Sequence, residues 1–175
     1  MELAQPNATL GLPQETWVIA SMKFTVPDLK SLSAAVLSLS AREHTALSAM
    51  IYRRQPDFCE IIDEVGMDPR CTQAHSFCTI FCALALEYAE EVLSFRLPRF
   101  QGDAFQEACG FLARGDSQIG RKASGYPKRI RRHVLSRVEF DEHDTAWLCT
   151  TISAFLFLIE KRLPRQLHPA HRYRT

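Results

Sequence analysis

The sequence has almost no net charge and no apolar run of membrane length, and we expect no signal peptide from its first residues. Its formal net charge is +1, so no overall field attracts nucleic acid or a membrane surface. The two uncharged segments that could suggest a membrane helix, 71–86 and 145–159, are shorter than the roughly 20 residues needed to span a bilayer. Residues 1–17 contain neither a cationic region nor an apolar run. We therefore expect a cytoplasmic protein that does not enter a membrane.

The sequence also lacks the common catalytic and cofactor motifs. It contains no Glu-x-x-His, the motif that helical di-iron proteins require, and no Cys-x2-Cys pair of the kind that forms zinc sites. Residues 115–122 resemble a phosphate-binding loop, but Arg121 precedes Lys122, and Ala123 occupies the position of the metal-binding Ser or Thr. We therefore expect no cofactor, and we favour a protein that is not an enzyme.

Two long, largely apolar segments predict an all-α fold. Residues 68–95 begin with Asp68 as a helix cap and Pro69 in the first turn, and no Gly or Pro follows before Pro98. Residues 141–162 are apolar on nearly every side. We expect a single-domain bundle of six to seven helices with these two at its centre.

Start and stop signals place the other helices at 27–37, 41–55, 57–65, 103–114 and 127–138. The clearest signal is the capping box that Ser40 forms with Glu43. Residues 16–26 alternate apolar and polar side chains, which predicts a short strand or extended arm. The predicted organisation is an N-terminal arm (1–26), a helical domain (27–163) and a basic C-terminal tail (164–175). An arm of this kind could pair with a second chain and support a homodimer.

The six cysteines lie mostly within helical patterns, which predicts free, buried thiols. At helical spacing, a stripe of potential metal ligands is formed by Cys71, His75, Cys78 and Cys82. These residues span three turns, so they cannot all reach one ion. We favour thiols that fill a seam between helices, and we keep a metal-dependent helical enzyme as an alternative.

Residues 58–77 have the outline of a helix-turn-helix motif, with Gly66 in the turn. In that motif Arg70, Gln73 and Ala74 would face DNA bases. Ile62 stands where close helix packing normally requires Ala or Gly. An ordinary helical corner is therefore the favoured interpretation.

Residues 121–137 form the most basic segment, with seven cations and no carboxylate. Its cationic residues are Arg121, Lys122, Lys128, Arg129, Arg131, Arg132 and Arg137. They could be neutralised by the acidic residues of 57–68 and 139–144, or they could bind an anionic partner such as nucleic acid. The favoured function is a non-enzymatic interaction or regulatory protein with a protein partner or a second copy of itself. Nucleic-acid binding is the first alternative.

Overall fold

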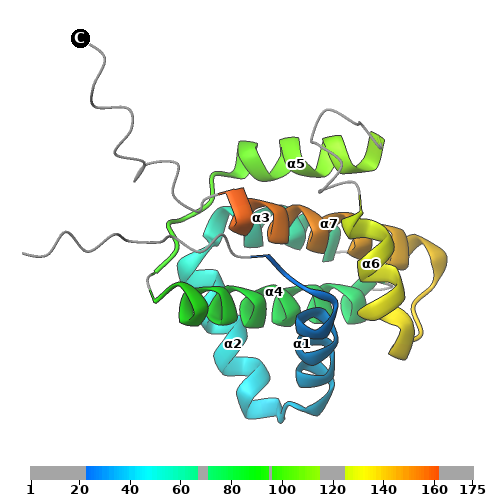
Figure 1. Ribbon diagram of the computed structural model, residues 1–175, viewed down its shortest axis with the longest axis horizontal. Coiled ribbons are helices and arrows are strands. Elements are labelled where there is room, and N and C mark those ends of the chain that lie inside the picture. The colour runs from blue at the N-terminus through cyan, green and yellow to red at the C-terminus, as the bar shows by residue number, and fades with distance from the viewer. Residues whose placement is uncertain (1–22, 67–70, 95, 115–124, 162–175) are drawn as a thin grey trace, which may run out of the picture.

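The computed structural model describes residues 23–66, 71–94, 96–114 and 125–161, and all regular structure in these ranges is helical (Figure 1). The helices are α1 (Val26–Ser38), α2 (Ala41–Arg54), α3 (Pro56–Gly66), α4 (Thr72–Leu93), α5 (Gly102–Arg114), α6 (Tyr126–His133), the short 3-10 helix η3 (Leu135–Arg137) and α7 (Glu142–Lys161). The predicted all-α fold is confirmed.

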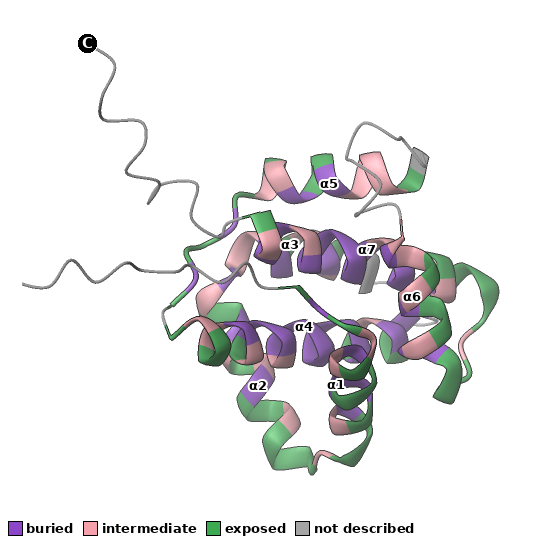
Figure 2. Cartoon of the chain, in the orientation of Figure 1, coloured by how far each residue is buried: buried purple, intermediate pink, exposed green. Residues whose placement is uncertain are grey.

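Helices α4 and α7 pack against each other at the centre of the bundle. Helix α5 covers the outer side of α7, whereas α1 and α2 cover the opposite side of α4 (Figure 1). Helix α3 packs against α2, α4 and α5, and α6 lies against both α7 and α1. Figure 2 shows the consequence, because buried positions cover most of α4 and α7 and only one side of α1 and α2.

The core of α7 matches the sequence prediction closely. Phe155 is completely buried, and its ring centroid lies 4.5 Å from that of Phe58 and 5.3 Å from that of Phe100. The helix is capped by Asp141, whose carboxylate accepts the backbone N–H of Asp144 at 2.7 Å. The predicted cap and the predicted burial of this helix are both confirmed.

Helix α4 is buried on more than one side. Phe77 and Phe81 are buried, and so are Cys78 and Cys82 of the predicted thiol stripe, whereas Val92 near the end of the helix is 52% exposed. Both the aromatic residues and the thiols therefore belong to the core. The proposed start at Asp68 and Pro69 lies outside the described residues, and the α-helix itself begins at Thr72.

Both of the first two helices begin with a capping box. The backbone N–H of Ser40 donates to Glu43 at 2.7 Å, and the backbone N–H of Glu43 donates to the Ser40 hydroxyl at 3.4 Å, as predicted. Thr25 and Asp28 form the same arrangement at the start of α1. The strand predicted for 16–26 is therefore wrong at its end, because Val26 is helical, and its residues 16–22 lie outside the described part of the chain.

Helices α1 and α6 also depart from their predicted outlines. The apolar Leu37 of α1 is 51% exposed, whereas the polar Ser33 is buried and donates its hydroxyl to the carbonyl of Val134 at 2.8 Å. Helix α6 ends at His133 rather than continuing to Val138, and the chain passes into η3.

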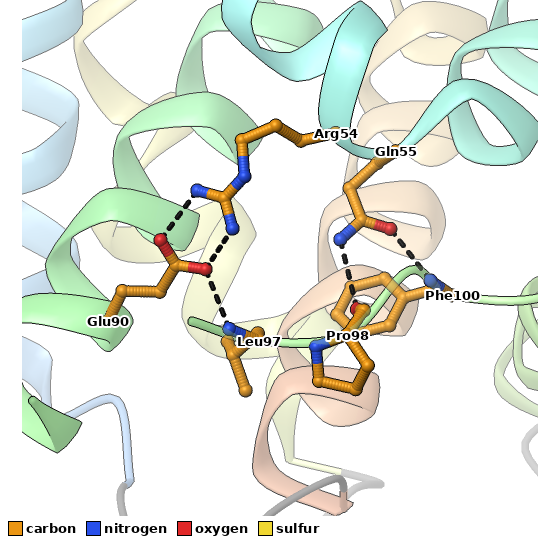
Figure 3. Close-up of polar contacts among 6 residues, drawn as sticks. All are labelled: Arg54, Gln55, Glu90, Leu97, Pro98 and Phe100. Atoms are coloured by element: carbon orange, nitrogen blue, oxygen red, sulfur yellow. Dashed lines mark hydrogen bonds and ion pairs between the residues drawn. The ribbon is translucent and has the colours of Figure 1, made fainter. Parts of the chain in front are cut away.

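The extended segment that leads from α4 to α5 is held by two polar side chains, Gln55 at the end of α2 and Glu90 of α4 (Figure 3). The buried Gln55 donates to the carbonyl of Pro98 at 3.2 Å and accepts from the N–H of Phe100 at 2.7 Å. Beside it, both carboxylate oxygens of Glu90 bind the guanidinium of Arg54, and one of them also accepts the N–H of Leu97 at 2.7 Å. A segment outside helices and strands has no regular backbone partners. Side chains bind its N–H and C=O groups here instead.

None of the described helices combines the length and hydropathy that a membrane crossing requires.

Candidate functional site

Helix α6 brings the described part of the basic segment to the surface. Pro127 lies in its first turn, a position that proline favours because the missing N–H has no partner there. Tyr126 and Ile130 are buried against the bundle, which leaves Lys128, Arg131 and Arg132 exposed. Arg121 and Lys122 lie outside the described residues.

Arg129 is held inward by two contacts. Its guanidinium donates to the carbonyl of Phe24 at 3.3 Å and lies 4.4 Å from the ring centroid of Tyr126. The Tyr126 hydroxyl donates to Glu160, and the same carboxylate oxygen accepts the N–H of Phe24 at 3.2 Å. Burial and the adjacent Glu160 carboxylate raise the pKa of Tyr126, so it stays protonated as a donor. Arg129 thus joins α6 to the start of the helical bundle.

Arg131 is partly neutralised. It donates to Glu142 of α7 at 2.6 Å, and both side chains are more than half exposed. An exposed pair of this kind adds little stability, but it cancels local charge. Glu142 belongs to the acidic group at 139–144, one of the two groups that could neutralise the basic segment, and it does so for Arg131.

Two acidic residues of α3 have their contacts with residues outside α6. Asp57 pairs with Arg99, and Asp63 accepts from Tyr52 and His75. Asp57, Glu60, Glu64 and Asp103 line an open hollow of about 540 Å³ between α3 and the start of α5. Acidic side chains therefore gather on α3 and α5, away from the contacts that α6 makes.

Lys30 of α1 adds a positive charge to those of α6. The hydrogen bond from Ser33 to the carbonyl of Val134 fixes α1 against the end of α6, and Lys30 lies one turn before Ser33. We call the surface formed by Lys30, Lys128, Arg132 and His133 the basic face. Within the described part of the chain, Lys30, Lys128 and Arg132 form no salt bridge.

Cations from both α1 and α6 act on His133. Loss of solvent around its ring, followed by the positive charges of Lys30, Arg132 and Arg129, lowers the pKa of His133 below its ordinary value. The nearest carboxylate of α1 is already engaged, because Asp28 caps the helix and accepts the hydroxyl of Tyr88 at 2.8 Å. Arg137 is exposed in η3, outside this group.

The Cys and His stripe of α4 has different surroundings. Cys71, Cys78 and Cys82 are buried, and His75 is directed to Asp63, with 2.8 Å between Nε2 and Oδ1. Burial is the main cause that raises the pKa of the Cys82 thiol well above its ordinary value, which disfavours the thiolate that metals bind. Among the described residues, no three His, Cys, Asp or Glu side chains are grouped so that they could hold a metal ion. The geometry gives the metal hypothesis no support.

The helix-turn-helix hypothesis also meets a conflict at α4. Gln73 is exposed, but Ala74, which should face bases beside it, is completely buried in the core. Arg70 lies outside the described residues. Helix α4 is the central helix of the bundle and packs against four others, so its first turn is not presented as a recognition helix would be.

No protein-family model, curated protein or solved structure matches this chain.

Proposed function

We propose that this protein is a helical interaction protein that binds nucleic acid through the basic face. The observation that carries the proposal is the convergence of Lys30 from α1 with Lys128 and Arg132 from α6, all exposed and outside the salt bridges of the described residues. The cytoplasmic location expected from the sequence remains a prediction.

The chemistry of this face suits a phosphodiester backbone. Contacts between cations and phosphates supply most of the sequence-independent affinity of proteins for nucleic acid. Lys128 and Arg132 are four residues apart, so they are neighbours on one side of α6. Local cationic patches set such an interaction more than net charge does, so a net charge of +1 is compatible with it.

The structure identifies which substitutions test the proposal. Arg129 and Arg131 are poor choices, because one stabilises the bundle and the other is paired with Glu142. The informative variant combines Lys30→Gln, Lys128→Gln and Arg132→Gln. Arg42→Gln, an exposed cation at the start of α2, is the matched control for loss of a positive charge elsewhere.

Binding of labelled single-stranded and duplex oligonucleotides is measured by fluorescence anisotropy over a range of salt concentrations. We expect salt-sensitive binding, with a slope of log K against log salt that flattens by up to about one unit for each lost phosphate contact in the triple variant. Arg42→Gln should behave as the unmodified protein. The proposal is wrong if the unmodified protein shows no salt-sensitive binding, or if the triple variant binds as the control does.

A further inference from the structure

His133 belongs to the basic face but carries no fixed charge of its own. It is the last residue of α6 and is half-buried. The adjacent Val134 carbonyl accepts the hydroxyl of Ser33 at 2.8 Å, and this buried hydrogen bond holds α1, the helix that carries Lys30, against the end of α6. The positive charges of Lys30 from α1 and of Arg132 from α6 both act on the imidazole.

The charged groups that act on His133 from α1 and α6 are cationic, and the carboxylate of α1, Asp28, is engaged by the helix cap and by Tyr88. Lys30 acts on it from α1, and Arg129 and Arg132 act on it from α6. On α7, Glu142 is bound to Arg131 and Glu160 to Tyr126. On η3 the charged side chain is Arg137. In the free protein these cations oppose protonation of the imidazole.

We propose that His133 is a fourth contact of the basic face and that it takes up a proton when a nucleic-acid phosphate binds there. The inference rests on the proposed function. A phosphate placed among Lys30, Arg132 and His133 supplies the negative charge that this cluster lacks, and it favours the imidazolium form. Protonated His133 then donates to the phosphate, as the lysine and arginine do.

The sign of the pH effect follows from linkage. The proton is bound more tightly in the complex than in the free protein, so affinity must increase as the pH falls. Between the pKa of the free protein, which lies below 6.5, and the higher pKa of the complex, affinity changes by up to about tenfold per pH unit. Above the pKa of the complex the contribution of His133 is lost.

The test uses a homo-thymidine oligonucleotide, whose bases do not titrate in the range examined, between about pH 5 and 8 at constant ionic strength. We compare the unmodified protein with His133→Gln, His133→Lys and the control His143→Gln, an exposed histidine at the start of α7. Affinity should rise on acidification for the unmodified protein and for His143→Gln, and should change little for His133→Gln. His133→Lys should bind at the upper end of the range as tightly as the unmodified protein binds at the lower end.

Calorimetric titration in buffers of different ionisation enthalpy measures the proton uptake directly. Uptake near neutral pH in the unmodified protein but not in His133→Gln supports the inference. If the unmodified protein binds and His133→Gln shows the same pH profile, the inference is wrong and the proposed function stands. If no salt-sensitive binding occurs at any pH, the proposed function is wrong and the inference is wrong with it.

Discussion

Gln55 accepts a hydrogen bond from the backbone N–H of Phe100, which lies 45 positions further along the chain. The same side chain donates to the carbonyl of Pro98, so one amide satisfies both a donor and an acceptor of an extended segment (Figure 3). Gln55 is completely buried, and so is Phe100. The amide therefore fixes the segment that carries the Phe100 ring into the aromatic core around Phe155.

Replacing Gln55 by Ala should cost about 2–4 kcal/mol of unfolding free energy, because it deprives two backbone polar groups of the partner that Gln55 supplies. The loss is measured by urea denaturation. Gln101→Ala, at an exposed position of the same connection, should change stability by less than about 0.5 kcal/mol. Equal losses at the two positions would show that Gln55 does not hold the segment.

The ion pair of Glu90 should make stability depend on pH in the acid range. Burial acts to raise the pKa of Glu90, but the hydrogen bonds from Arg54 and the Leu97 N–H outweigh it and lower the pKa below 4.5. A carboxyl whose pKa is depressed on folding contributes stability above its unfolded pKa, and this contribution is lost as the pH falls through the folded pKa. Glu90→Gln should therefore lose about 1–3 kcal/mol near neutral pH and much less near about pH 3. Urea denaturation at both pH values checks this, with Glu91→Gln as the exposed neighbour that should differ little from the unmodified protein.

The Ser40 capping box predicts that Ser40→Ala destabilises the protein by about 1 kcal/mol, because the first turn of α2 loses a hydrogen-bond acceptor. Ser76→Ala, at an exposed position inside α4, should be close to neutral. Denaturant titration of both variants distinguishes loss of a cap from loss of any serine hydroxyl. A neutral Ser40→Ala would contradict the role of the box in holding α2.

Phe155→Ala should cost roughly 3–5 kcal/mol, since the ring is completely buried and packs against both Phe58 and Phe100. Phe157→Ala provides the same substitution two residues away, at a half-buried position under Lys161. We expect the loss there to be less than half as large. Comparable losses would mean that α7 is not buried along the face described.

The cysteines should react slowly in the native protein. All six have free thiols, and five are buried. Burial is the main cause that raises the pKa of both Cys59 and Cys109 to about 12, so the reactive thiolate is scarce near neutral pH. An alkylating reagent should therefore label the folded protein little and all six thiols after denaturation without reductant. A count below six in the denatured protein would contradict the prediction of reduced cysteines.

Much of the fold follows from local signals in the sequence. The cap at Ser40, the cap at Asp141 and the apolar residues of α7 act over one or a few helical turns, so the printed sequence contains what determines them. Thr25 and Asp28, with Pro27 between them, carried a comparable signal at the start of α1. The alternation in 16–26 gave a competing strand prediction, and the capping box is the stronger local determinant at Val26.

The parts that could not be predicted depend on contacts between distant residues. The prediction continued α6 through Val134, but the carbonyl of Val134 binds Ser33, which lies 101 positions away. Which residues form the basic face also depends on tertiary structure, because the packing of α1 against α6 adds Lys30 to it. Arg129 is turned toward Phe24, a residue that no local pattern relates to the basic segment.

The contact between Phe24 and Glu160 has a consequence for how the protein is made. The two residues lie 136 positions apart, so a ribosome delivers Glu160 on the order of ten seconds after Phe24. Until α7 has emerged, Tyr126 lacks its acceptor, and α4 lacks the helix that covers one of its apolar sides. The nascent chain therefore cannot complete the bundle during synthesis of its first helices, because α7 supplies the partners that Phe24, Tyr126 and α4 require.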